Sequence, residues 1–140
     1  MKRFWCVCVL VVVPVVAILG GGCAGGYGEN EQLRRQVDQF NDSVRWGRYY
    51  SAALFIRDDA RADWLHSHRE WGRDLRIADY EVVDSNLEPN DSRTAVIRVV
   101  VSWYRLSENE IQTTMLAQRW RRQGRTWQLI SEEVEEGTPL

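Results

Sequence analysis

The chain has 140 residues, of which 44% are hydrophobic and 27% are charged, and its net charge is −2. This length fits one domain and excludes a multidomain enzyme or a membrane protein with several spans. Seven Trp, five Tyr and three Phe residues provide enough bulky apolar surface to exclude a disordered chain. The slightly acidic balance does not indicate a nucleic-acid partner.

An apolar segment at the N-terminus indicates export. Lys2 and Arg3 precede a run of 16 mainly apolar residues, Phe4–Leu19, and three glycines then lead to Cys23. A basic start, an apolar centre and a small-residue end are typical of a secretory signal peptide. Because the run is shorter than the roughly 20 residues of a membrane-spanning helix, we expect residues 1–22 to be a signal peptide rather than a retained anchor.

Removal of the signal peptide leaves Cys23 as the only cysteine and changes the net charge to −4. A single cysteine in an exported chain requires an explanation. Its position directly after the glycines resembles the lipobox of bacterial lipoproteins, in which the cysteine receives a diacylglycerol and becomes the N-terminus. The resemblance implies lipidation at Cys23 and a membrane partner through that lipid.

The residues around the cysteine refine the expected location in the bacterial cell envelope. Ala24 follows the cysteine, and in Gram-negative lipoproteins a residue other than Asp there implies the outer membrane, facing the periplasm. Glycines at three of the next four positions predict a flexible tether over residues 23–29. Gly20 stands where lipoboxes commonly have Leu, so cleavage after Ala24 and a soluble periplasmic protein remain an alternative.

The first half of the mature domain, residues 30–132, predicts helices. Apolar residues recur at helical spacing over Glu29–Trp46, with Asn30 as the N-cap, and their stripe consists of Leu33, Val37, Phe40 and Val44. A second helix is expected at Tyr49–Ile56. A third is expected at Ala60–Trp71, capped by Asp58 or Asp59, ended by Gly72 and carrying Trp64, His68 and Trp71 on one face.

The second half predicts strands joined by short turns. Alternating or β-branched patterns mark four segments, which are Ile77–Ser85, Thr94–Leu106, Ile111–Arg121 and Thr126–Ser131. Short connections between consecutive strands predict antiparallel pairing. Residues 133–140 are acidic and are expected to form a frayed tail. Helices followed by a meander predict an α+β fold, with the helices on one face of a curved antiparallel sheet.

Three segments carry a resemblance to the nuclear transport factor 2-like superfamily. They are Ala52–Ala53 at the second helix, Ile77–Val83 and Gln118–Leu129. The resemblance implies a cone-shaped α+β domain in which helices close a bent sheet, and a cystatin-like fold is the alternative. It also implies a homodimer or an envelope protein partner at the exposed sheet face. The superfamily contains both enzymes and binding proteins, so it does not specify a function.

Aromatic side chains either line a pocket inside such a cone or fill its core. The candidates for the pocket lining are Tyr50, Trp64, His68, Trp103 and Trp120. His66 and His68 are two residues apart and would point to different faces of a helix, so we expect no metal site. Arginines crowd the last hairpin at Arg119, Arg121, Arg122 and Arg125, where they are expected to be solvated and to protect the sheet edge.

No short sequence motif indicates catalysis. The chain has no nucleophile elbow, phosphate-binding loop, zinc spacing or dinucleotide fingerprint. We therefore assign no catalytic residue and expect no cofactor and no nucleic acid. The sequence favours a lipid-anchored, non-catalytic binding or assembly module for a protein partner or a small apolar ligand. The alternative is an isomerase-like or dehydratase-like enzyme with its site inside the cone.

Overall fold

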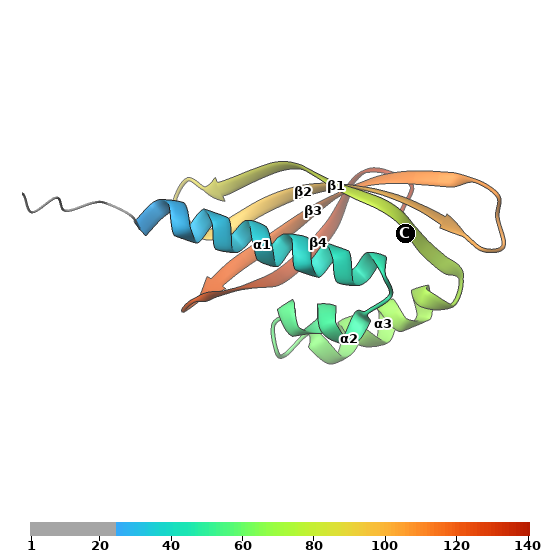
Figure 1. Ribbon diagram of the computed structural model, residues 1–140, viewed down its shortest axis with the longest axis horizontal. Coiled ribbons are helices and arrows are strands. Elements are labelled where there is room, and N and C mark those ends of the chain that lie inside the picture. Colours follow the sequence, from blue (N-terminus) through green and yellow to red (C-terminus); the bar gives the residue numbers. More distant parts are fainter. Residues whose placement is uncertain (1–24) are drawn as a thin grey trace, which may run out of the picture.

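The computed structural model describes residues 25–140, which form helices on one side of a four-stranded antiparallel sheet (Figure 1). The elements are α1 (Gly25–Arg45), α2 (Tyr49–Ala52), a 3₁₀ turn (Ala53–Phe55), α3 (Arg61–Asp74), β1 (Leu75–Glu88), β2 (Asp91–Arg105), β3 (Ile111–Gln123) and β4 (Thr126–Gly137). The strands follow one another in the order β1-β2-β3-β4. The predicted α+β class is thereby confirmed.

The expected signal peptide and the lipidation at Cys23 lie outside the described residues. Within residues 25–140, no helix has both the length and the hydrophobicity that crossing a membrane requires.

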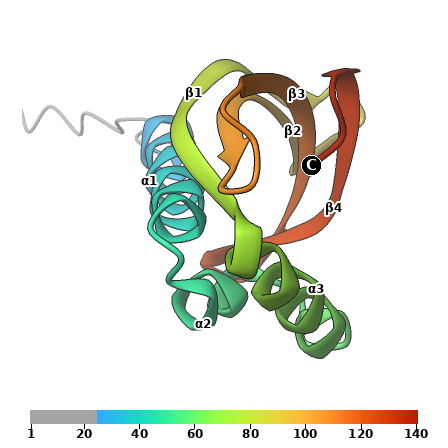
Figure 2. The same cartoon turned by 90° about the vertical axis from the view of Figure 1, so that its right-hand side faces the viewer.

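Helix α1 runs along the open side of the curved sheet (Figure 2). Its predicted stripe is confirmed, because Leu33, Val37 and Phe40 are buried and Val44 packs against the core. The helix begins at Gly25 rather than at Glu29, so the predicted flexible tether is wrong from Gly25 onward. Once Leu33 and Val37 anchor the helix, each further turn adds hydrogen bonds without a new nucleation cost.

Helix α3 differs from its prediction at both ends. Ala60 precedes it without a side-chain cap, and Asp58 instead accepts a hydrogen bond from Arg61 Nη2 at 2.6 Å. Gly72 lies inside the helix rather than ending it. A Cβ at Gly72 would lie 2.6 Å from Tyr49 Cε2, so this glycine serves close packing against α2 and not helix termination.

The C-terminal residues are ordered, which corrects the predicted frayed tail. Strand β4 continues to Gly137, with Val134 opposite Leu116 and Gly137 opposite Thr114 on β3. Glu133, Glu135 and Glu136 of the strand are exposed, so their charge does not prevent backbone pairing with β3. The prediction failed because it read side-chain polarity, whereas strand pairing uses the main chain.

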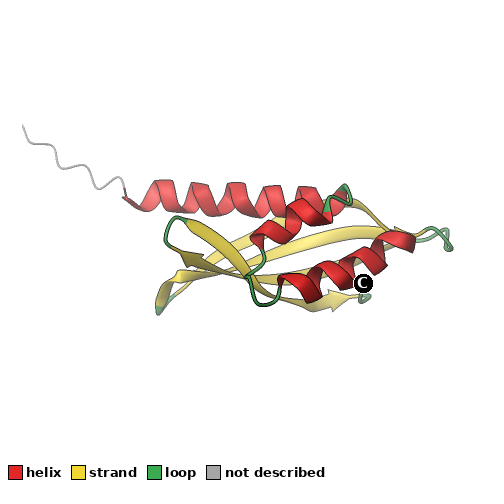
Figure 3. Cartoon of the chain, turned by 90° about the horizontal axis from the view of Figure 1, so that it is seen from below, coloured by secondary structure: helices red, strands yellow, loops and turns green. Residues whose placement is uncertain are grey.

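The core lies between the concave face of the sheet and the helices (Figure 3). Strands β2 and β3 bury every second side chain on that face, including Val99, Trp103 and Trp120. Phe40 of α1 packs edge to face on Trp120, with ring centroids 5.5 Å apart. Aromatic rings therefore fill the space between the layers.

Candidate functional site

A small cluster of polar side chains lies within this aromatic core. Asn41 of α1 and Gln118 of β3 exchange two hydrogen bonds, at 2.8 and 3.2 Å. Gln118 Nε2 also donates to Glu132 Oε2 at 2.8 Å. Asn41 and Gln118 are buried, and burial raises the pKa of the Glu132 carboxyl, although the hydrogen bond from Gln118 partly opposes this.

His68 borders the same region from α3. Its Nδ1 lies 2.9 Å from the carbonyl oxygen of Trp64, which assigns the proton to Nδ1 and leaves Nε2 as the nitrogen with a lone pair. The imidazole stacks on the Trp64 ring at 3.8 Å and contacts the Trp71 ring at 4.2 Å. Burial lowers the pKa of His68 to about 4, so the side chain is neutral at pH 7.

The space left beside this cluster is only about 20 Å³. Its wall combines apolar and polar side chains from every layer of the fold, namely Phe40, Asn41, Val44, His68, Trp71, Ile77, Tyr80, Val101, Leu116, Glu132 and Leu140. A volume of this size holds about one water molecule and no substrate. The interior is therefore closed in this conformation.

The predicted pocket residues separate into three environments. Trp103 and Trp120 are 2% and 0% exposed and fill the core, and Trp64 packs between Phe40 and His68. His68 alone of the five borders the small interior cavity. Tyr50 is 66% exposed, which contradicts its expected place in the pocket. It lies on the short helix α2, whose side toward the core carries Ala52 instead.

The two histidines lie on different sides of α3, with His66 exposed and His68 buried. Among residues 25–140, no group of three or more His, Cys, Asp or Glu side chains has metal-binding geometry. At the last hairpin, Arg119 forms an ion pair with Glu88 of β1.

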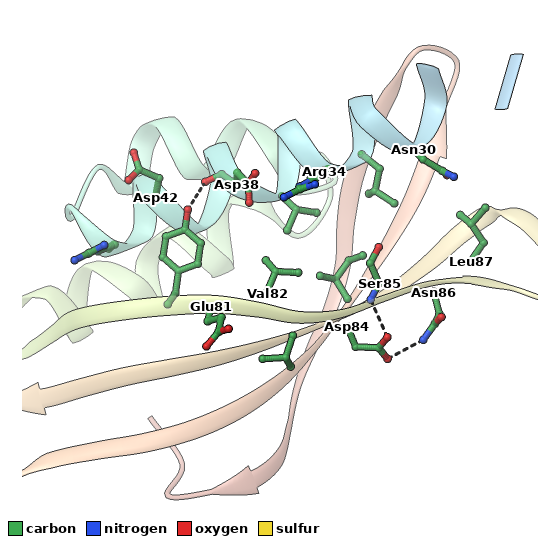
Figure 4. Close-up of a pocket in the computed structure, with 16 residues that line it drawn as sticks. Asn30, Arg34, Asp38, Asp42, Glu81, Val82, Asp84, Ser85, Asn86 and Leu87 are labelled. Carbon is green, nitrogen blue, oxygen red and sulfur yellow. Dashed lines mark hydrogen bonds between the residues drawn. The ribbon is translucent and has the colours of Figure 1, made fainter. Parts of the chain in front are cut away.

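An open groove of about 930 Å³ lies between α1 and β1 (Figure 4). Its apolar lining consists of Leu33, Val37, Val82, Val83, Leu87 and Ile97. Tyr80 also lines the groove, and its hydroxyl donates to the carbonyl oxygen of Asp38 at 3.2 Å, so this hydrogen bond joins β1 to α1. Leu87 is 41% exposed although its partner Ala95 is fully buried. Helix α1 therefore leaves this part of the concave face open.

Carboxylates outnumber guanidinium groups around the groove. Four acidic residues line it, Asp38, Asp42, Glu81 and Asp84, against two arginines, Arg34 and Arg45. Three of the six side chains are engaged with residues outside the lining: Asp42 with Arg48 at 2.5 Å, Arg45 with Asp79 at 2.9 Å and Asp84 with Arg98 at 2.7 Å. The groove therefore combines an apolar floor with a charged rim on which carboxylates are the more numerous groups and several are already in ion pairs.

The sequence analysis did not identify this groove or the polar interior cluster. Both depend on residues far apart in the chain, such as Asn41 and Gln118, which are 77 positions apart. The apolar alternation of β1 was visible in the sequence, but nothing in it indicated that the inner face near Leu87 would stay open. Glu132 directly precedes the predicted acidic tail, where a partly buried carboxyl is not expected.

Comparison with known proteins supports the fold alone. No family model and no curated protein matches the sequence. Several solved structures are similar to this one in shape, at 9–14% sequence identity. The fold is that of nuclear transport factor 2-like and cystatin-like proteins.

Three of these structures show the range of the likeness. A scytalone dehydratase-like protein of Novosphingobium aromaticivorans has 12% identity and a TM-score of 0.64, over 81% of this chain and 86% of its own. A protein of unknown function with a cystatin-like fold from Nostoc punctiforme has 9% identity and a TM-score of 0.59, over 79% and 91%. A SEC-C motif containing protein of Rhodopseudomonas palustris has 10% identity and a TM-score of 0.61, over 76% and 88%.

Proposed function

We propose that this protein is a lipid-anchored module of the bacterial cell envelope that binds a protein partner in the groove between α1 and β1 and catalyses no reaction. The observation that carries the proposal is the contrast in free space. About 930 Å³ is open between α1 and β1, whereas about 20 Å³ remains inside the core.

The free edge of β1 favours an extended segment of the partner. Within the described part of the chain, β1 pairs with β2 on one side and with no strand on the other. An extended peptide can add to such an edge through main-chain hydrogen bonds. The inner face of β1 carries Val82 and Leu87, which pair with the core residues Val99 and Ala95, whereas Glu81 lies on the outer face. A segment that alternates apolar and basic residues complements both faces.

The enzyme alternative is less well supported. It requires a buried acid or base that faces a cavity large enough for a substrate. Glu132 and His68 meet the first requirement, but the cavity beside them is too small for the second. The likeness to a scytalone dehydratase-like protein is at 12% identity and carries no active-site assignment.

The location and the assembly state belong to the same proposal. Lipidation at Cys23 would hold α1, which begins at Gly25, close to a membrane surface. The residue that follows the cysteine favours the outer membrane. A homodimer through the outer face of the sheet remains a prediction, since the helices lie on the other side of the sheet (Figure 1). Sedimentation velocity of the mature chain tests it.

Two experiments test the function. Labelled palmitate fed to a Gram-negative host expressing the full chain should label the wild type and not Cys23→Ala. An unlabelled wild type contradicts the lipid anchor.

For the groove, a peptide of alternating lysine and valine should slow amide hydrogen exchange along β1. Equal protection by an alternating glutamate and valine peptide, or none by either, contradicts the docking site.

A further inference from the structure

Arginines gather at the end of the domain where α1 begins. The turn between β1 and β2 and the turn between β3 and β4 both lie at this end (Figure 1). Two hydrogen bonds join the second turn to α1, because Gln32 Nε2 donates to the carbonyl oxygen of Arg125 and the main-chain nitrogen of Trp127 donates to Gln36 Oε1. We call the two turns and the strand residues next to them the basic end. Its arginines are Arg93, Arg119, Arg121, Arg122 and Arg125.

The carboxylates of the basic end do not balance its arginines. Two acidic residues lie there, Glu88 and Asp91, and each is paired with an arginine of the basic end. Among the described residues, Arg121 and Arg125 take part in no ion pair, and both are exposed. The first turns of α1 do not change the balance, since they add two acidic residues and two arginines, Glu29, Glu31, Arg34 and Arg35.

Acidic residues take the corresponding places at the opposite end of the sheet. Glu108 and Glu110 lie between β2 and β3, and Glu136 lies near the end of β4, opposite Met115 of β3. The whole chain has a net charge of −2, so the excess of positive charge at the basic end makes the domain electrically asymmetric along the sheet. A domain with this asymmetry turns its basic end toward a negatively charged surface.

The position of the proposed lipid places the basic end next to a membrane. Cys23 is two residues before Gly25, where α1 begins. Two residues span at most about 7 Å, whereas a helix of the length of α1 extends over about 30 Å. An anchor at Cys23 therefore keeps the first turn of α1, and the two turns beside it, within reach of the lipid headgroups.

We propose that the basic end docks on the phosphate headgroups of an anionic phospholipid bilayer, with Arg121 and Arg125 as its main contacts. The inference rests on the proposed lipid anchor and adds to it the orientation in which the anchored domain stands on the membrane. Guanidinium groups bind phosphate through charge-assisted hydrogen bonds. Each basic residue near an anionic surface strengthens the association about five-fold. The lipid supplies the attachment, and the arginines direct the acidic end away from the bilayer.

The test couples the mature chain through Cys23, its only thiol, to a maleimide phospholipid in vesicles. Vesicles of phosphatidylcholine alone are compared with vesicles that also contain phosphatidylglycerol. Amide hydrogen exchange at short labelling times should be slower in the turn between β3 and β4 on the phosphatidylglycerol vesicles only. Exchange in the turn between β2 and β3 should be the same on both. High salt should remove the difference, because it screens the attraction.

A double substitution tests the two arginines. Arg121→Gln with Arg125→Gln should lower the ratio of docked to undocked domains about 25-fold, which is about five-fold for each arginine, and the slower exchange should be lost. Arg121→Lys with Arg125→Lys keeps both charges and should retain it. Arg69→Gln with Arg73→Gln is the matched control, because it removes two exposed arginines from α3, away from the basic end. This control should behave like the wild type.

The outcomes separate this proposal from the lipid anchor. Equal exchange on both kinds of vesicle, or a difference that survives high salt, overturns the docking, as does an equal loss in the α3 control. The salt dependence of the wild type decides the question even if the glutamine variant does not fold. Because the coupling is chemical, it does not depend on lipidation in the cell. An unlabelled wild type in the palmitate experiment contradicts the natural anchor, whereas a labelled wild type without slower exchange contradicts the docking alone.

Discussion

The two spaces beside α1 differ in what fills them. On one side of the helix, Phe40 meets Trp120 and the aromatic rings leave about 20 Å³. On the other side, the helix and β1 diverge and about 930 Å³ stays open. Both spaces lie against the concave face of one sheet, and both are bordered by Tyr80.

The difference follows from which elements cover the sheet. Where α1 and α3 both lie over the strands, large side chains reach across and fill the space. Where α1 alone faces the far half of β1, no second helix closes the gap, and Leu87 remains 41% exposed. We therefore expect a partner to bind where the helices no longer cover the sheet. The side chains that contribute most to the stability of the fold are expected where the helices cover it.

The largest expected effect concerns the filled side. Trp120→Ala removes a fully buried indole that contacts Phe40 and Phe55, and should lower the free energy of unfolding by about 3–5 kcal/mol. Urea denaturation followed by circular dichroism measures this. Trp46 is 62% exposed, so Trp46→Ala should cost less than about 1 kcal/mol. Equal losses at both positions would mean that the core is not where the structure places it.

The buried histidine predicts a pH dependence of stability. The folded pKa of His68 is lowered from 6.5 to about 4, so the unfolded chain binds the proton first as the pH falls. Stability that is present above pH 6.5 should be lost down to about pH 4, by up to about 3 kcal/mol. The raised pKa of Glu132 acts oppositely, because its contribution falls as the pH rises above the usual carboxyl range.

Two variants separate these titrations. His68→Phe should abolish the loss of stability toward pH 4, and Glu132→Gln should abolish the decline at higher pH. His66 is exposed, so His66→Ala should leave the profile unchanged. A profile for His68→Phe that matches the wild type would show that His68 is not buried as a neutral imidazole.

A smaller effect is expected at the polar cluster. Gln118→Leu keeps a similar volume but leaves Asn41 and Glu132 without this partner, which should cost about 1–3 kcal/mol. Asn41→Leu combined with Gln118→Leu should cost less than the sum of the two single changes, because the two amides satisfy each other. Strict additivity in a denaturation cycle would show that the two side chains do not interact.

The smallest effect on stability is expected in the groove. Leu87→Asp changes a side chain that is already exposed, so the free energy of unfolding should change by less than about 0.5 kcal/mol. Binding of the lysine and valine peptide should nevertheless be lost, because the apolar contact is removed. Leu106→Asp, at a turn residue that is 56% exposed and lies outside the groove, should retain binding. Loss in both variants would indicate non-specific association.

Several features of the fold could be predicted because they depend on local periodicity. The spacing of Leu33, Val37 and Phe40 identified the buried face of α1, and the face shared by Trp64, His68 and Trp71 is confirmed by their stacking. Helix ends were less predictable. From the sequence alone, Gly72 predicts the end of α3. In the structure the ring of Tyr49 packs against Gly72, and the helix continues past it.

The amino-acid pattern by itself determined the order of helices and strands, the apolar stripe of α1 and the α+β class, because side-chain periodicity of 3.6 or 2 residues is a local property. Only the tertiary structure decided that Gln118 meets both Asn41 and Glu132, that Leu140 borders the core and that the face of β1 near Leu87 stays open. Each of these depends on how far a helix extends over a curved sheet, and that geometry is set by packing between residues distant in the chain.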